Sequence, residues 1–328
     1  MTSAPPAVSP NQSAISVRGL TKRFGTQTVL DGLDLEVRAG SIYALLGPNG
    51  AGKTTTVQIL STLLAPDAGQ AFVAGHDVGR NPDGVRATIG VTGQYSAVDG
   101  LLTGAENLQL MADLHRLGRR ESRARVHELL DRFDLVAAAG QRARDYSGGV
   151  RRRLDLAMSL VGRPRVVFLD EPTTGLDPRS RRAMWQVIVE LAGDGVTILL
   201  TTQYLEEADQ LADRIAVLDC GRLVAEGTAD ELKRLVPGGH IALRFTDHSG
   251  LDAASRVVAG TTRDHDALTL QVPSDGSVRA LRGLLADLDE RDIAIADLSI
   301  HTPDLDDVFF ALTGTEHAPT TNLEVDAQ

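Results

Sequence analysis

Hydrophobic and polar residues alternate in the first part of the chain and then give way to short apolar runs. Between Ile15 and Val37 the alternation surrounds Phe24 and Gly25, which predicts short antiparallel strands. The run Ile42–Leu46 is continuously apolar and leads directly into a glycine-rich segment. Behind the glycines, apolar residues recur at helical spacing, at Val57, Leu60 and Leu64. A strand, a glycine-rich loop and a helix are therefore expected in that order.

The middle of the chain, about 95–160, has helical periodicity. One buried stripe shows it most clearly, at Val126, Leu129, Leu130 and Phe133. Strand-like runs then return at 166–169, 196–200 and 215–218, with an amphipathic helix between the first two. Strands that alternate with helices predict an α/β domain whose mostly parallel sheet is covered by helices on both faces.

The segment Pro237-Gly238-Gly239 indicates a linker to a second, smaller domain. The elements predicted beyond it are strand 240–246, helix 251–258, strands 260–264 and 267–272, helix 277–290 and strand 293–301. This β-α-β-β-α-β order predicts a small α+β domain of the ferredoxin-like kind at 240–314, with a last helix near 305–312. The other expected parts are a flexible leader at 1–14, a main domain at 15–236 and a flexible tail at 315–328.

Composition and charge restrict the function and the compartment. The 328 residues carry a formal net charge of -11 without a block of clustered lysines or arginines, which argues against a nucleic-acid partner. No apolar run approaches the roughly 18 residues that span a bilayer. The first residues lack the basic start and the apolar core of a signal peptide. Because Cys220 is the only cysteine, no internal disulfide can form, and a reducing cytoplasm is expected.

The glycine-rich segment GPNGAGKTT matches the pattern GxxxxGK[ST] of phosphate-binding loops. Its residues are Gly47, Pro48, Asn49, Gly50, Ala51, Gly52, Lys53, Thr54 and Thr55. Glycines let successive backbone N–H groups turn toward one anion. We expect Lys53 to bridge the β- and γ-phosphates of a bound nucleotide and Thr54 to ligate Mg²⁺. This loop alone leaves kinases, GTPases and many ATPases open.

Two carboxylates follow the apolar run at 166–169. Asp170 and Glu171 stand at the carboxyl end of that strand, the edge at which open α/β sheets bind ligands. We expect Asp170 to hold Mg²⁺ through a water, and Glu171 to be the base that orients and polarises the attacking water. An ordinary acidic strand end is the alternative, and it is the weaker one because PTTGLDP follows the pair.

Two turns allow both a structural and a functional interpretation. Ser147, Gly148 and Gly149 open a helix, so they suit either a γ-phosphate or a plain helix cap without a ligand. Asp177 precedes Pro178, the combination of an Asp N-cap and a proline at the first helical position. The helix beginning at 178 is therefore predicted whatever else Asp177 does.

Taken together, GPNGAGKTT at 47–55 and the stretch from YSGGV to VVFLDEPTTGLDP at 146–178 resemble the nucleotide-binding subunit of an ABC transporter. The resemblance covers about 15–314. It implies a P-loop NTPase fold with antiparallel β and helical subdomains. It also implies ATP and Mg²⁺ as ligands, a dimer of two copies around two MgATP, and a separate membrane permease as partner at the cytoplasmic face of a bacterial membrane.

The same resemblance assigns roles to single residues. It implies that Ser147–Gly149 serve the nucleotide held by the other copy and that Asp177 reaches across the dimer interface. Phe24 matches the aromatic residue that stacks on adenine, with a core phenylalanine as the alternative. Gln94 matches the glutamine that senses Mg²⁺ and water, although by itself it reads as a surface glutamine before a turn. Thr55 supports the α-phosphate side.

Gln203 departs from the family pattern, which has a histidine there. The glutamine amide can donate to a γ-phosphate oxygen but cannot carry a proton or positive charge at neutral pH. TTQYLEEAD around it, with LDDVFFALTG at 305–314, resembles the ATPases of the daunorubicin/doxorubicin-resistance type. An exporter of drugs or other hydrophobic cargo is therefore expected. An importer ATPase, or a soluble ABC ATPase of translation or DNA repair, is the alternative.

Overall fold

The structure, a computed structural model, describes residues 13–93, 97–236, 239–258, 260–274, 277–301 and 303–314. The chain divides into two compact units, Met1–Ala229 and Asp230–Gln328. The expected leader lies outside the described residues up to position 12, and so does the expected tail at 315–328. Of the expected linker, only Gly239 is described. Within the described part, no helix is long and apolar enough to cross a membrane.

The larger unit begins with an antiparallel sheet in the strand order β2-β1-β4-β5. Its strands are β1 (Ser13–Phe24), β2 (Gln27–Arg38), β4 (Ala68–Val73) and β5 (His76–Asp77). Phe24 pairs with Gln27 at the turn between β1 and β2, which confirms the predicted antiparallel strands. Ile15 of this sheet shares one hydrophobic core with Tyr43 and Phe168 of the neighbouring sheet.

That neighbouring sheet has six strands in the order β10-β9-β3-β8-β7-β6. They are β3 (Ile42–Leu46), β6 (Ile89–Thr92), β7 (Val166–Asp170), β8 (Thr197–Thr202), β9 (Arg214–Asp219) and β10 (Arg222–Gly227). All neighbours pair in parallel except β10, which pairs antiparallel with β9 at the edge. Every residue of β3, β7 and β8 is buried, as expected of strands covered on both faces. The predicted mostly parallel sheet is confirmed.

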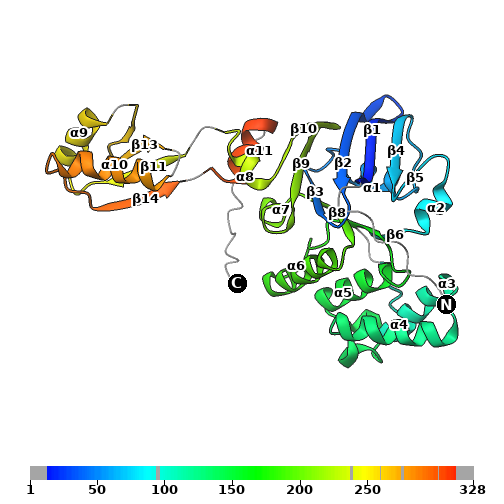
Figure 1. The fold of residues 1–328 in the computed structure, drawn as a ribbon. Helices are drawn as coiled ribbons and strands as arrows, with labels where there is room; N and C mark the ends of the chain where they lie inside the picture. The colour runs from blue at the N-terminus through cyan, green and yellow to red at the C-terminus, as the bar shows by residue number, and fades with distance from the viewer. Residues whose placement is uncertain are drawn as a thin grey trace, which may run out of the picture. The chain divides into compact units, whose positions relative to one another are not determined.

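Helices are inserted between the strands of the larger unit. They are α1 (Lys53–Leu60), α2 (Pro82–Arg86), α3 (Gly104–Leu114), α4 (Arg119–Arg132), α5 (Gly148–Ser159), α6 (Pro178–Gly193) and α7 (Leu205–Leu211). Figure 1 shows α3, α4 and α5 grouped on one side of this sheet, with the antiparallel sheet on the other. Within the group, Leu129 and Phe133 of the predicted stripe are buried, and Thr103 and Glu106 form a capping box at the start of α3.

The smaller unit contains a four-stranded antiparallel sheet in the order β12-β13-β11-β14. Its elements are α8 (Ala229–Lys233), which begins at the division, β11 (His240–Arg244), α9 (His248–Val257), β12 (Thr262–Asp264), β13 (Thr269–Pro273), α10 (Val278–Asp289), β14 (Asp297–His301) and α11 (Leu305–Thr313). The β-α-β-β-α-β succession from β11 to β14 has the predicted ferredoxin-like order. Phe245, Leu251 and Leu288 are buried in the core between its helices and its sheet.

Candidate functional site

Three neighbouring strands of the six-stranded sheet end at the same edge. In their parallel register Leu46 of β3 pairs with Thr202 of β8, and Asp170 of β7 pairs with Thr201 of β8. Parallel strands run in one direction, so the segments that follow them leave the sheet together. These segments are the phosphate loop, the carboxylate turn and the turn that holds Gln203. The larger unit therefore brings the three predicted parts of the site to one edge.

The phosphate loop is a backbone cradle that requires its glycines. A Cβ added at Gly47 would lie 2.3 Å from the carbonyl oxygen of Leu218, and one at Gly52 would lie 2.6 Å from Cδ2 of Leu30. Gly50 and Gly52 have positive φ angles of 83° and 106°, a region that favours glycine. The α1 helix then begins at Lys53 with its N–H groups and its dipole directed at the loop. This cradle fits the phosphates of ATP.

Lys53 places an ammonium inside this cradle. It is only 5% exposed, and its Nζ donates to the carbonyl oxygens of Gly47 at 2.6 Å and Pro48 at 3.1 Å. Nζ also lies 4.0 Å from Oε1 of Glu171. Burial lowers the pKa of Lys53, and the negative charges of Glu171 and Asp170 oppose that shift. A phosphate bound between the loop and the two carboxylates would lie beside the Lys53 ammonium.

Asp170 and two threonine hydroxyls form a compact cluster of oxygens. Asp170 is 3% exposed, and its Oδ1 accepts from Oγ1 of Thr54 at 3.2 Å and from Oγ1 of Thr201 at 2.5 Å. Hard oxygen donors are what Mg²⁺ prefers, and it usually binds one or two carboxylates together with waters and substrate phosphates. The residues present therefore fit this ion. Thr201 was not predicted from the sequence, where its only signal is the threonine pair that ends β8.

Glu171 stands on a strained backbone. Its φ of 48° lies in the left-handed region, which is unusual for a residue with a side chain. Its N–H bonds to both the carbonyl oxygen and Oγ1 of Thr201, at 3.2 and 3.1 Å, and its Oε2 accepts from Oγ1 of Thr174 at 3.2 Å. Such strain, about 1–3 kcal/mol, persists only where the surroundings hold it, and it clusters at active sites.

The turns at Ser147 and Asp177 both begin helices, as predicted. Oγ of Ser147 caps α5 by accepting from the N–H of Val150 at 3.4 Å, and Ser147 itself is exposed. Oδ1 of Asp177 caps α6 by accepting from the N–H groups of Arg179 and Ser180, both at 3.0 Å. Hydrogen bonds from Ser180 hold the pKa of Asp177 below its usual value.

These two turns touch each other. A Cβ added at Gly149 would lie 2.5 Å from Oγ of Ser180, the hydroxyl that donates to Oδ2 of Asp177 at 2.6 Å. Gly149 is thus needed for the close approach of α5 to the start of α6. The role of Ser147–Gly149 and Asp177 toward a second copy stays a prediction.

Phe24, Gln203 and Gln94 lie on three further segments. Phe24 is 49% exposed at the end of β1, and Nζ of Lys22 lies 5.5 Å from the centre of its ring. An exposed ring offers a face to a base, whereas a core phenylalanine would not. Gln203 is half-buried between β8 and α7, directly after the strand that borders both β3 and β7. Gln94 lies outside the described residues, and Gly93, just before it, follows β6.

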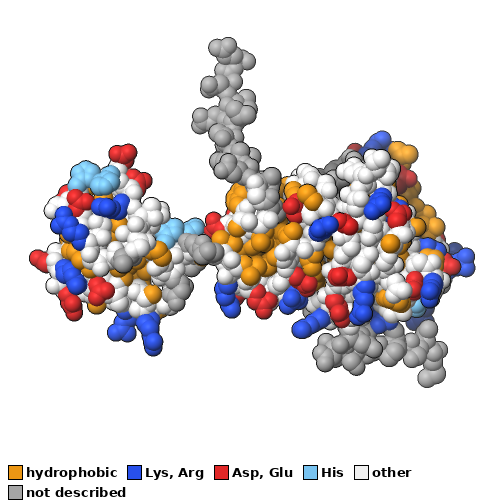
Figure 2. All heavy atoms as spheres, turned by 90° about the horizontal axis from the view of Figure 1, so that it is seen from above, with side chains coloured by type: hydrophobic (Ala, Val, Ile, Leu, Met, Phe, Trp, Pro, Cys, Tyr) orange, Lys and Arg blue, Asp and Glu red, His pale blue; other side chains and the backbone are white. Residues whose placement is uncertain are grey.

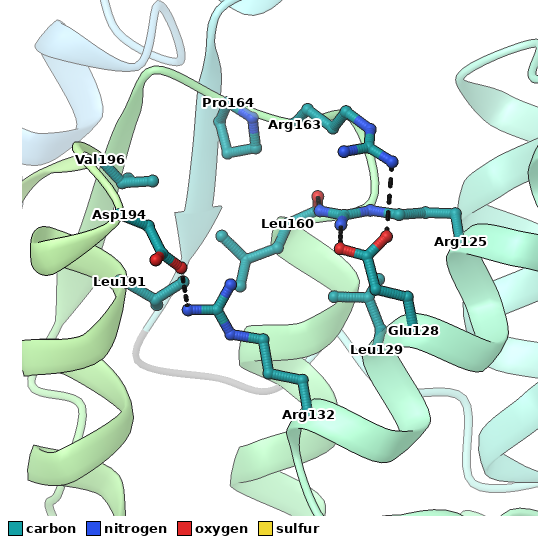
Figure 3. A pocket seen from close by; sticks show the side chains of 10 residues that line it. All are labelled: Arg125, Glu128, Leu129, Arg132, Leu160, Arg163, Pro164, Leu191, Asp194 and Val196. Carbon is teal, nitrogen blue, oxygen red and sulfur yellow. Dashed lines mark hydrogen bonds and ion pairs between the residues drawn. The ribbon is translucent and has the colours of Figure 1, made fainter.

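A cavity of about 330 Å³ lies elsewhere, near the starts of β7 and β8, and Figure 3 shows its lining. Its three arginines and two acids form ion pairs. Glu128 pairs with Arg125 at 2.5 Å and with Arg163 at 3.4 Å, and Arg132 pairs with Asp194 at 2.5 Å. The Arg132–Asp194 pair joins α4 to the end of α6. On the face shown in Figure 2, acidic and basic side chains are interspersed.

Comparison with known proteins gives a consistent result. The family described as ABC transporter matches residues 30–174. The chain is 52% identical over 306 residues to the daunorubicin resistance ATP-binding protein DrrA3 of Streptomyces coeruleorubidus, with 93% of this chain and 97% of the relative covered. It is 37% identical over 315 residues to the Nod factor export ATP-binding protein I of Ralstonia nicotianae, with 92% and 94% covered.

Solved structures agree with this. One is the ATP-binding subunit of an ABC transporter, with a TM-score of 0.62, 29% identity and coverage of 68% of this chain and 92% of that chain. Another is a dimeric ATP-binding cassette in a post-hydrolysis state bound to ADP and Pi, with a TM-score of 0.59, 26% identity and coverage of 65% and 98%.

Proposed function

Because the chain belongs to the ABC transporter family and is an ATPase with that family's P-loop fold, we propose that it drives an exporter through a separate membrane permease. One observation carries the ATPase part: Lys53, Thr54, Asp170 and Glu171 come together at one edge of the sheet. The export direction is supported by relatives named for drug resistance and for Nod factor export. A drug or another hydrophobic compound is the cargo that these names favour.

Within this site, different residues of the chain have different roles in hydrolysis. The loop N–H groups and Lys53 bind the phosphates. Thr54 and, through a water, Asp170 would hold Mg²⁺, which would supply positive charge against the phosphate oxygens. Glu171 orients a water and takes its proton as the water oxygen bonds to the γ-phosphorus and the bond to the β,γ-bridging oxygen breaks. ADP and inorganic phosphate result. Gln203 and Gln94 are the proposed contacts to the γ-phosphate, the water and Mg²⁺.

A dimer completes this proposal. Ser147 lies exposed at the start of α5, where its hydroxyl and the following N–H groups can meet an anion on another copy. Two copies would then enclose two ATP molecules, each held by the loop of one copy and the Ser147–Gly149 turn of the other. Phe24 is proposed to stack on adenine. The dimer would act on its permease at the cytoplasmic face of a bacterial membrane.

Glu171→Gln tests the proposed base. The change keeps the size of the side chain but removes a proton acceptor, so we expect turnover to fall about 100-fold or more while ATP still binds. Phosphate release measures turnover, and the fluorescence of a labelled ATP analogue measures binding. We also expect ATP to bring this variant to a dimer in size-exclusion chromatography.

Glu190→Gln, an equal charge loss at an exposed position of α6, is the control and should leave turnover near that of the wild type. Normal turnover in Glu171→Gln would refute the assigned base. Purification of the tagged chain from membranes tests the transport role, because a permease with several apolar spans should accompany it. Recovery with ribosomes instead would contradict that role.

A further inference from the structure

One side chain of α5 connects three separate segments of the site. Arg152 is 13% exposed, and its guanidinium lies beside the turn that follows β7. It donates to the carbonyl oxygens of Pro172 at 2.9 Å, Gly93 at 2.9 Å, Asp170 at 3.0 Å and Glu171 at 3.2 Å, and to Oδ2 of Asp155 at 3.2 Å. The planar guanidinium holds its donors in a fixed fork, so these contacts constrain one another.

The three consecutive carbonyls that Arg152 holds belong to the turn that carries the proposed base. Glu171 is the residue of this turn with the left-handed backbone, and a strained backbone needs surroundings that fix it. Thr201 fixes the N–H side of Glu171, and Arg152 fixes the carbonyl side. Hydrogen bonds from a charged donor are about twice as strong as neutral ones. Arg152 is therefore a main support of the conformation that aims the carboxylate.

The same arginine belongs to the helix that begins at Ser147. It lies within two turns of the N-cap of α5, and its further contact to Gly93 reaches the residue before Gln94. A displacement of the start of α5 would thus be passed directly to the turn of Glu171. We propose that Arg152 is a positioning residue that holds Glu171 in its working orientation and couples it to the start of α5. This inference rests on the proposed ATPase function.

The helix supplies its own matched control. Arg153 has the same charge but turns the other way, where its Nη1 donates to the carbonyl oxygen of Phe133 at 3.0 Å and to Oδ2 of Asp134 at 3.1 Å. Loss of Arg153 removes equal charge and two hydrogen bonds from the same helix without touching the turn of Glu171. A difference between the two arginines therefore cannot come from helix charge alone.

The test compares Arg152→Gln with Arg153→Gln in purified full-length protein. For Arg152→Gln we expect kcat to fall about 10–100-fold with ATP affinity within roughly 3-fold of the wild type, since the phosphate loop is untouched. For Arg153→Gln we expect both quantities to stay within roughly 3-fold. Arg152→Lys keeps the charge but not the fork, so its kcat should lie between those of the wild type and Arg152→Gln.

A double variant separates positioning from general damage. In the Glu171→Gln background the base is already removed, so adding Arg152→Gln should leave the residual turnover unchanged. Wild-type kcat in Arg152→Gln, equal losses in the two arginine variants, or a further additive loss in the double variant would overturn the inference. If Arg152→Gln fails to fold, full wild-type turnover in Arg152→Lys would overturn it. Failure of the proposed function looks different, because the wild type itself would then bind or hydrolyse no ATP.

Discussion

Gln203 stands where the resemblance to ABC ATPases implies a histidine. It follows β8 directly, beside the strands that deliver the phosphate loop and the carboxylates. A glutamine amide offers a neutral N–H donor in every protonation state between pH 5 and 9, whereas an imidazole changes its charge within that range. The γ-phosphate contact at this position is thus expected to be insensitive to pH.

Gln203→Ala should slow turnover about 10-fold with ATP affinity within roughly 3-fold, because one donor to a charged oxygen is lost. Gln203→His should retain turnover but add a pH dependence with a midpoint near the usual imidazole value of about 6.5. Phosphate release measured from pH 5.5 to 8.5 checks both variants. Unchanged turnover in Gln203→Ala would make Gln203 a bystander.

At the scale of elements, Glu207 ties helix α7 to its neighbours. It is 1% exposed, and its Oε1 accepts from Oγ1 of Thr173 at 2.7 Å and from Nε1 of Trp185 at 3.1 Å. Thr173 lies in the turn that leads from Glu171 to Asp177, and Trp185 lies on α6. One buried carboxyl thus fixes three elements, including the one that follows Gln203.

Glu207→Leu should cost about 2–4 kcal/mol of stability, because the Thr173 hydroxyl and the indole N–H lose their acceptor in the core. The chain has a single tryptophan, so urea unfolding followed by the fluorescence of Trp185 reports on the larger unit. Glu206→Leu is the control, since Glu206 is exposed and pairs with Arg181 only loosely at 3.9 Å. An equal loss of stability in both variants would contradict the role of Glu207.

Burial also raises the pKa of Glu207, against the hydrogen bonds of Thr173 and Trp185 and the charge of Arg181. The folded state then binds more protons at this group than the unfolded state, so its contribution to stability falls as pH rises from the unfolded pKa through the folded one. Glu207→Gln keeps an acceptor for its partners and does not titrate. Urea unfolding measures the free energy of unfolding at pH 5 and at pH 8. The decrease in this free energy from pH 5 to pH 8 should be smaller in Glu207→Gln than in the wild type.

Elements were easier to predict than contacts. The apolar runs at 166–169 and 215–218 and the Asp177 cap before Pro178 are local patterns, and the elements they predict are present in the structure. The partners of Asp170 were not predictable in the same way. Thr201 reaches Asp170 only because β8 lies beside β7, and strand order depends on the whole domain and not on periodicity. The turn at Glu171 and its support by Arg152 depend on the same long-range packing.

At the scale of the whole molecule, the proposed dimer has composite sites, and mixing variants can test it. Ser147→Arg should block the partner-facing turn, and Glu171→Gln should remove the base. Each variant alone should be nearly inactive. In an equal mixture, half of the dimers are mixed, and each of these keeps one intact site, so roughly a quarter of the wild-type turnover should return.

A pair of variants that both affect the chain's own half of the site, Lys53→Ala with Glu171→Gln, is the control and should regain nothing. Phosphate release after co-expression or after mixing of purified proteins measures the recovery. Absence of recovery in the first pair, with dimers present, would contradict composite sites.

The contact between Gly149 and Ser180 affects how such a dimer would separate. Since not even a methyl group fits between the start of α5 and the start of α6, a copy that withdraws Ser147 from its neighbour withdraws Asp177 with it. A half-released state, with one turn engaged and the other free, would be too rare to matter. Release of the two turns would then have a single rate constant.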